Sequence, residues 1–377
     1  MTERARSAYV HVPFCARRCG YCSFAVVAGR PDLVEPYLRA IEQELAWLGS
    51  PREVDTLYFG GGTPSQLGLD TLQRLLDLVL AWHPLAPGGE FTVEANPLDL
   101  DQAKLGLLAE HGVTRLSLGA QSFDDAKLVF LERDHRASHI HRAYDLARRH
   151  IGTVALDLIF AVPGESPATW AADLAQAVAL GADHLSTYDL TIEKGARFYG
   201  PRRRGLLALP AEPLQRSMFI LAMDHLTDAG YDHYEVSSFA RPGRRCRHNE
   251  AYWLGATYYG VGPGAARYLD GRRELNHRST TTYLRRILAG ATAVVEREVL
   301  AQEDVAREVL VFALRRLEGV DRHWFSAKTG AALDQLLGPA LAQFVQLGLL
   351  ADDGRCVRLT RAGLLVSDSI WPHFLRR

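Results

Sequence analysis

The chain has 377 residues, of which 47% are hydrophobic and 23% are charged, and these values are ordinary for a globular protein. Its formal net charge of -1 gives no overall attraction to nucleic acid or to an anionic membrane. No apolar run reaches the length of a bilayer span, and the first residues lack the apolar core of a signal peptide, so we expect a cytoplasmic protein.

Up to about residue 195, short β-rich runs alternate with longer stretches in which apolar residues recur every three or four positions. This strand-then-helix pattern repeats six times, which is typical of parallel strands joined by helical crossovers. The predicted strands are residues 8–12, 54–59, 90–94, 114–119, 154–160 and 184–190.

Unusual residues follow every one of these strands. Cysteines follow the first, GGGT the second, and EANP, GAQSF, AVPGES and TIEKGARF the others. An open doubly wound sheet concentrates its site at one switch point, whereas a barrel uses all of its C-terminal loops. We therefore predict an α/β fold in which residues 1–200 form an incomplete (β/α)6 barrel.

The pattern changes after residue 200. Residues 201–295 contain the basic connector PRRRGLLALP, a predicted helix and the aromatic stretch HNEAYW, and we expect this segment to pack on the barrel. Residues 296–377 show three helical patterns followed by a hairpin pattern. This order predicts a small C-terminal helical domain that resembles a winged helix.

Three of the five cysteines, Cys15, Cys19 and Cys22, lie within eight residues after the first strand. Thiolates are soft ligands, so zinc, copper and an iron–sulfur cluster are the candidates. A structural zinc ion needs four ligands and would have to add His11 or Cys246. A [4Fe–4S] cluster held by three thiolates leaves one iron open for a substrate or cofactor.

The spacing Cys-x3-Cys-x2-Cys after the first strand of an incomplete barrel resembles the radical S-adenosylmethionine (SAM) superfamily. The motifs YVHVPFCARRCGYCSF, YFGGGTPS, VEANP, LGAQSF, LDLIFAVPGES and HNEAYW together resemble its oxygen-independent coproporphyrinogen III oxidase group, and most closely the shorter heme-chaperone members of that group. The resemblance implies a [4Fe–4S] cluster on Cys15, Cys19 and Cys22, with SAM chelating the fourth iron through its amino and carboxylate groups.

The resemblance also implies a set of SAM-binding residues at the strand ends. Bare glycine backbone there lets a ligand approach closely, and a buried aspartate within VALDLIF needs a donor or cation beside it. Taken alone, Glu94 also fits a carboxylate that pairs at the barrel rim, Arg133 an exposed helical arginine, and Tyr9 a core residue. The complete set is Tyr9, Gly61, Gly62, Thr63, Glu94, Gln121, Arg133 and Asp157.

Two departures distinguish this chain from the oxidases that it resembles. Their motif has a fourth cysteine where this chain has Phe24, and the chain begins only eight residues before its first strand, without their N-terminal extension. We therefore expect a protein that binds haem as cargo and passes it to an acceptor protein, which can be a transiently bound membrane protein. An electron donor is the other expected partner. Oxidative decarboxylation of coproporphyrinogen III to protoporphyrinogen IX stays the alternative.

His248 in the HNxxYW stretch is the predicted haem ligand, because a histidine among aromatic residues can bind haem iron. A lone histidine more often forms hydrogen bonds within a structured loop, and Cys246 and His277 are further candidates. The haem propionates would suit the nearby arginines Arg244, Arg245 and Arg247.

A third class is a nucleic-acid-modifying radical SAM enzyme. The winged-helix-like C-terminal pattern and the arginine run at 202–204 suggest it, whereas the net charge near zero argues against it. We expect no nucleic-acid partner. Basic side chains of residues 300–377 gathered on one face would favour this class.

Overall fold

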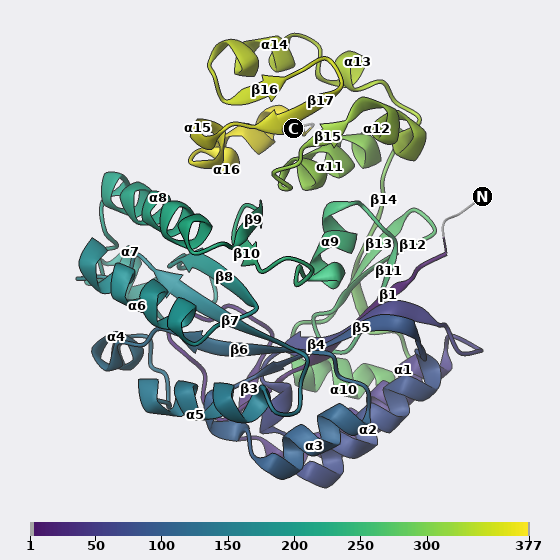
Figure 1. Cartoon of the computed structure of the whole chain (residues 1–377). Helices are drawn as coiled ribbons and strands as arrows, with labels where there is room; N and C mark the ends of the chain where they lie inside the picture. Colours follow the sequence, from purple (N-terminus) through teal and green to yellow (C-terminus); the bar gives the residue numbers. More distant parts are fainter. Residues whose placement is uncertain (1–3, 376–377) are drawn as a thin grey trace.

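The computed structural model describes residues 4–375 and is built around one mixed sheet of twelve strands (Figure 1). The six predicted strands lie side by side in chain order, and every neighbouring pair is parallel. A doubly wound sheet would reverse its strand order at a switch point, so this order confirms the incomplete barrel. The strands are β1 (Ser7–Val12), β4 (Val54–Gly61), β5 (Leu85–Ala95), β6 (Arg115–Gln121), β7 (Thr153–Phe160) and β8 (His184–Asp189).

Helical crossovers connect the parallel strands and cover the outside of the sheet (Figure 1). Each longer helix buries one face, as Leu38, Ile41 and Leu45 do in the first, at the spacing of an amphipathic helix. The buried faces pack on outward strand residues such as Phe59 and Phe91. The helices are α1 (Val34–Ala46), α2 (Leu69–Trp82), α3 (Gln102–Glu110), α4 (Asp125–Phe130), α5 (Ala137–Ala147) and α6 (Pro167–Ala179).

Residues 232–299 extend this sheet at both edges with strands that the sequence patterns do not predict. At one edge, β11 (Tyr258–Val261) pairs parallel with β1, and β12 (Ala266–Leu269), β13 (Arg272–Asn276) and β14 (Val294–Val299) follow antiparallel. At the other edge, β10 (Ser238–Ala240) and β9 (Asp232–Glu235) follow β8. Within residues 4–375 the outermost strands, β14 and β9, do not pair with each other, so the barrel stays open.

A buried carboxylate fixes the added strands to the barrel. Glu44 on α1 accepts hydrogen bonds from the Gly262 N–H at 2.9 Å, the Asn276 amide at 2.7 Å and the Tyr283 hydroxyl at 2.6 Å. Satisfying a buried carboxylate in this way joins three segments that are far apart in the sequence. Between β8 and β14 the chain forms the helices α7 (Tyr199–Arg203), α8 (Glu212–Asp228), α9 (Arg247–Trp253) and α10 (Thr280–Leu288).

The C-terminal unit lies above the barrel next to α9 (Figure 1). Its three-stranded antiparallel sheet has the order β15-β17-β16 and packs with short helices, which confirms the winged-helix-like prediction. None of the helices in the described residues is long and apolar enough to cross a membrane. The elements are α11 (Gln302–Leu314), β15 (Val320–Asp321), α12 (Arg322–Thr329), α13 (Leu333–Leu337), α14 (Pro339–Gln346), β16 (Leu350–Asp352), β17 (Cys356–Leu359), α15 (Arg361–Leu364) and α16 (Ser367–Ile370).

Candidate functional site

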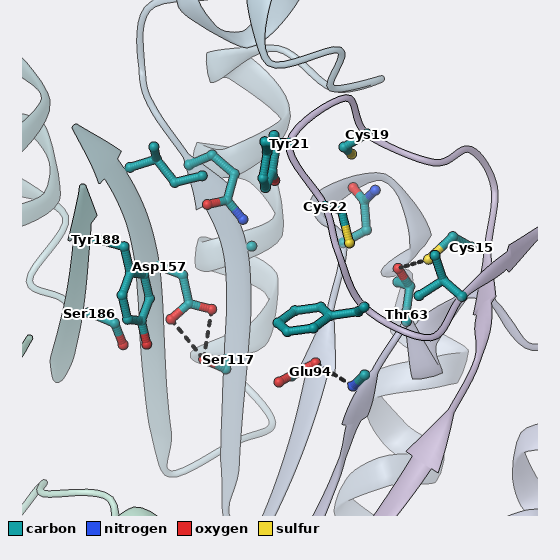
Figure 2. Close-up of a pocket in the computed structure, with 18 of the residues that line it drawn as sticks. Cys15, Cys19, Tyr21, Cys22, Thr63, Glu94, Ser117, Asp157, Ser186 and Tyr188 are labelled. Atoms are coloured by element: carbon teal, nitrogen blue, oxygen red, sulfur yellow. Dashed lines mark hydrogen bonds between the residues drawn. The ribbon is translucent and has the colours of Figure 1, made fainter. Parts of the chain in front are cut away.

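The cysteine loop, residues 15–22, follows β1 and lies over the C-terminal ends of the barrel strands (Figure 2). A short parallel pair, β2 (Phe14–Cys15) with β3 (Val27–Ala28), joins the start of the loop to the segment that follows it. The Thr63 N–H donates to the Phe14 carbonyl at 2.7 Å, and the His11 ring bonds the Ala25 carbonyl at 2.8 Å. These contacts hold the three cysteines at one end of the barrel.

A cavity of about 570 Å³, called the cysteine cavity below, lies between this loop and the strand ends. Its size suits a small-molecule ligand. The three cysteines line it together with all the predicted SAM residues except Tyr9, namely Gly61, Gly62, Thr63, Glu94, Gln121, Arg133 and Asp157. Figure 2 shows the three cysteines on their loop, with Thr63 beside Cys15 and with Glu94 and Asp157 on the barrel strands. The structure therefore brings most of the predicted site into one place.

The cysteines and their neighbours fit a cluster. Thr63 Oγ1 donates to Cys15 Sγ at 3.5 Å, and Arg133 Nη1 donates to Cys19 Sγ at 3.6 Å, so both sulfurs face donors that stabilise a thiolate. Burial raises the pKa of Cys15 to about 11 and also raises that of Cys22, and a bound iron would take the place of those protons. In residues 4–375 no three His, Cys, Asp or Glu side chains converge around a single metal ion. In a cluster each thiolate binds a different iron.

Arg133 also offers a donor to a ligand. Its Nη2 donates to the Gly119 carbonyl at 3.0 Å, but its buried Nε–H has no hydrogen-bond partner in the described part of the chain. A Cβ on Gly119 would lie 3.0 Å from Gln121 Nε2 and 3.4 Å from Arg133 Nη2, so this glycine leaves room for both side chains. A buried guanidinium with a free N–H suits an anionic group such as a carboxylate.

Two partly buried carboxylates, Glu94 and Asp157, line the cavity. Glu94 accepts hydrogen bonds from the Tyr58 hydroxyl at 2.8 Å and the Gly61 N–H at 3.0 Å, and Asp157 accepts one from Ser117 at 3.2 Å. Burial, with a smaller contribution from Asp157, raises the pKa of Glu94 to about 7. Burial also raises the pKa of Asp157. Both can accept hydrogen bonds from a cationic or hydroxyl-bearing ligand.

The raised pKa of Glu94 predicts a pH-dependent cost to the ligand-free protein. The pKa of Glu94 in the folded protein lies above its ordinary value of 4.5, so the protonated carboxyl stabilises the fold at low pH. The protein loses this stabilisation as the pH rises from 4.5 through the pKa of the folded state. Between about pH 5 and pH 8 the wild type should therefore lose about 2.5 kcal/mol of unfolding free energy relative to Glu94→Gln. Urea denaturation at both pH values measures this. Parallel pH profiles of the two proteins would show that Glu94 titrates normally.

Several lining residues escaped the sequence-based prediction. Tyr58, Ser117, Ser186 and Tyr188 sit on the barrel strands and face the cysteine cavity. The sequence could have indicated these residues, because alternate residues of a strand face the same side and polar residues recur at alternate positions in these mostly apolar runs. Arg115 and His184 lie at the starts of β6 and β8 and line the same cavity.

A second cavity of about 470 Å³, called the aromatic cavity below, lies between β1, β4, α9, β12 and α11. It shares Tyr58, Glu94 and Asn249 with the cysteine cavity, so the two adjoin. Tyr9 lines this one instead, and its hydroxyl bonds His11 Nδ1 at 3.1 Å. The aromatic walls are Tyr9, Tyr58, Tyr252, Trp253, Tyr258, Tyr268 and Phe312, with His248 beside them.

His248 is 1% exposed, and both of its ring nitrogens are hydrogen-bonded. Nδ1 lies 2.9 Å from Thr56 Oγ1, and Nε2 lies 2.9 Å from the Tyr252 hydroxyl. Burial lowers the pKa of His248 to about 3, so the ring is neutral. His248 lines the aromatic cavity, but both of its ring nitrogens are already used in hydrogen bonds to other side chains.

The other residues suggested for haem have protein partners. Arg245 pairs with Asp232 and Glu318. Cys246 is buried in the cysteine cavity, donates to Glu90 Oε1 at 3.6 Å, and has a pKa raised by burial to about 12. Arg244 bonds Thr153, Arg247 bonds the Gly88 carbonyl, and His277 is not among the described residues that line either cavity.

Comparison with known families matches two parts of the chain. The radical SAM superfamily matches residues 9–177, and the HemN C-terminal domain matches residues 300–366. An incomplete parallel barrel with three clustered cysteines at its C-terminal end, followed by this domain, defines the radical SAM class. Among solved structures, the coproporphyrinogen III oxidase HemN from Escherichia coli, a radical SAM enzyme, has a TM-score of 0.87 over 99% of this chain and 90% of that chain. At 23% identity this likeness shows the shared fold alone.

Curated relatives extend over nearly the whole chain. The heme chaperone HemW of Bacillus subtilis is 34% identical over 98% of this chain and 99% of that protein, and HemW of Escherichia coli is 35% identical over 98% of each. Radical S-adenosyl methionine domain-containing protein 1, mitochondrial, from Danio rerio is 34% identical over 98% of this chain and 86% of that protein. The chain therefore belongs to the HemW family of radical SAM proteins.

Proposed function

We propose that this protein binds a [4Fe–4S] cluster, SAM and haem in the cytoplasm and delivers the haem to an acceptor protein. The observation that carries the proposal is the cysteine cavity, in which Cys15, Cys19, Cys22 and seven predicted SAM residues meet. The relatives named heme chaperone HemW support haem as the cargo.

In this proposal the thiolates of Cys15, Cys19 and Cys22 hold the cluster, and Thr63 and Arg133 stabilise the sulfurs that they contact. The Nε–H of Arg133, which has no protein partner in the described residues, would donate to a carboxylate of SAM. Glu94 and Asp157 accept hydrogen bonds from its ribose or ammonium groups. When bound, the cluster supplies one electron to SAM, and an electron-donor protein replaces that electron.

The aromatic cavity is the proposed haem site. A flat, mostly apolar macrocycle suits walls of tyrosine, tryptophan and phenylalanine. Arg273, paired there with Glu308, is a cation suited to a propionate. The cavity adjoins the cysteine cavity through Tyr58, Glu94 and Asn249, so SAM and haem would lie side by side.

Coproporphyrinogen III oxidation is the alternative, favoured by the shared fold of HemN. Phe24, which is 62% exposed at the edge of the cysteine cavity, stands where the oxidase motif has its fourth cysteine, and this argues against it. We do not propose a nucleic-acid partner, because every arginine in residues 300–375 forms an ion pair with an acidic side chain. These are Arg307, Arg315, Arg316, Arg322, Arg355, Arg358 and Arg361.

Haem and coproporphyrinogen assays on the reconstituted protein test the proposal. Haem titration should give a saturable Soret band, and incubation with coproporphyrinogen III, SAM and a reductant should give no protoporphyrin fluorescence. Filling the aromatic cavity with Ala256→Trp should weaken haem binding roughly tenfold or more and leave the iron content unchanged. The control is Ala289→Trp on the exposed end of α10. Protoporphyrin formed at turnover rates would establish the oxidase instead.

A further inference from the structure

Four side chains form a hydrogen-bond relay at the wall of the aromatic cavity: Tyr252, His248, Thr56 and Ser7. The Tyr252 hydroxyl lies 2.9 Å from His248 Nε2, His248 Nδ1 lies 2.9 Å from Thr56 Oγ1, and Thr56 Oγ1 donates to Ser7 Oγ at 2.9 Å. The relay joins α9 to the first two strands of the barrel.

The hydrogen bond from Thr56 to Ser7 fixes which atoms donate in the other two hydrogen bonds of the relay. Thr56 has one hydroxyl proton, and it points to Ser7, so Thr56 Oγ1 must accept from His248 Nδ1. The neutral imidazole then has its proton on Nδ1 and a lone pair on Nε2. That lone pair accepts the phenol proton of Tyr252.

The two ring nitrogens of His248 are therefore poor candidates for binding iron. Nδ1 carries the proton, and Nε2 could reach a metal only by giving up its bond to Tyr252. The ring is also almost fully buried. The phenol oxygen of Tyr252, by contrast, keeps lone pairs while its proton already points to an acceptor, and Tyr252 lines the aromatic cavity. Tyrosine is a known ligand of haem iron.

We propose that Tyr252 is the axial ligand of bound ferric haem and that His248 is the positioning residue that receives its proton. The inference rests on the proposed haem function and names the iron-binding residue within it. The Tyr252 ring is held edge-on against Tyr258, with the centroids 4.6 Å apart at 87°, and against His248, at 4.9 Å and 88°. The phenol is thus held in position before haem arrives.

The binding step balances without an electron transfer. The O–H bond of Tyr252 breaks, its oxygen forms a bond to Fe(III), and the proton passes to His248 Nε2. His248 Nδ1 gives its own proton to Thr56, Thr56 gives its proton to Ser7, and one proton leaves Ser7 for solvent, so the imidazole stays neutral. A water molecule bound to the iron of free haem leaves, and the iron stays ferric. Reduction to Fe(II) favours the reverse step, because the phenolate is a hard anionic ligand.

The test is the absorption, electron paramagnetic resonance and resonance Raman spectrum of ferric haem bound to the full-length protein. The wild type should show a phenolate-to-iron charge-transfer band and phenolate vibrations. Tyr252→Phe should lose both and bind haem roughly tenfold more weakly or worse. Tyr144→Phe, which removes a hydroxyl bonded to the Gly181 carbonyl outside both cavities, should keep them. His248→Ala should keep the phenolate signature at reduced affinity, which a directly coordinating histidine would not allow.

The wild-type spectrum decides the question even where a variant folds poorly. An imidazole-ligated spectrum that survives Tyr252→Phe and disappears in His248→Ala would overturn the assignment of Tyr252 and leave the haem function standing. A wild-type protein that binds no haem at all would overturn both proposals, so the two failures are distinguishable.

Discussion

Anaerobic reconstitution of Cys19→Ala should leave the protein almost without iron and sulfide. Cys19 is buried and its sulfur accepts a hydrogen bond from Arg133, so its loss leaves two thiolates and removes one partner of the Arg133 cation. One ligand of a structural metal site contributes about 3 kcal/mol, judged from four-ligand zinc sites, and losing it weakens binding roughly 100-fold. Iron and sulfide per chain, together with the cluster absorption, measure the effect.

Two matched controls separate cluster ligands from other thiols. Cys356→Ala changes a cysteine of β17 whose thiol donates to the Glu318 carbonyl, and it should reconstitute fully. Cys246→Ala changes a buried cysteine that lines the same cavity from the α9 side, and it should keep the cluster as well. If Cys246→Ala lost iron as completely as Cys19→Ala, a fourth protein ligand would be present and the three-ligand assignment would be wrong.

The parallel part of the fold was predictable because its signals are long and repetitive. The first five barrel strands are apolar runs that are followed by helices with buried apolar residues, and unusual residues follow each strand. The strands of residues 232–299 were not predictable in the same way. They are three to six residues long, and some carry charged pairs, such as Arg267 of β12 with Glu274 of β13, in place of an apolar run.

The candidate site shows the same division. Gly61 and Glu94 come from strand ends, and parallel topology brings such positions together without detailed knowledge of side chains. Asp157 lies within β7, where it interrupts an otherwise apolar run. Tyr9 sits earlier on its strand and therefore lines the neighbouring aromatic cavity. The spacing of His248 and Tyr252 suggests one helix face, but only the structure shows that Thr56, from a distant strand, occupies the other ring nitrogen.

The two cavities share a wall, and this bears on how one site could influence the other. Tyr58 donates to Glu94 on the cysteine side, while its ring lies 5.0 Å from that of His248 on the aromatic side. A ligand that draws the Glu94 carboxylate toward itself would shift the hydroxyl of Tyr58 and with it the ring beside His248. Tyr58 therefore contacts functional residues of both cavities.

Gly62→Ala should destabilise the protein and lower its cluster and SAM content, although Gly62 has no side chain to bind either. A Cβ at this position would lie 2.7 Å from the Val12 carbonyl oxygen and 2.8 Å from that of Phe14. Both atoms are backbone and cannot rotate away, so the segment leading into Cys15 must move. Overpacking of this kind costs about 1–3 kcal/mol. Urea denaturation, iron analysis and equilibrium dialysis of SAM measure the three effects.

Gly68→Ala is the control, because it lies in the same connection between β4 and α2. Its φ of -62° suits any residue, and a Cβ there would meet no heavy atom within 4 Å. The change should stay within about 0.5 kcal/mol and leave the cluster intact. If Gly62→Ala kept its full stability and cluster content, the backbone of Val12–Phe14 would be able to move aside without lowering the free energy of unfolding. The close approach of the two segments would then not hold Cys15 in place, and the thiol would depend on the β2–β3 pairing and on Thr63 instead.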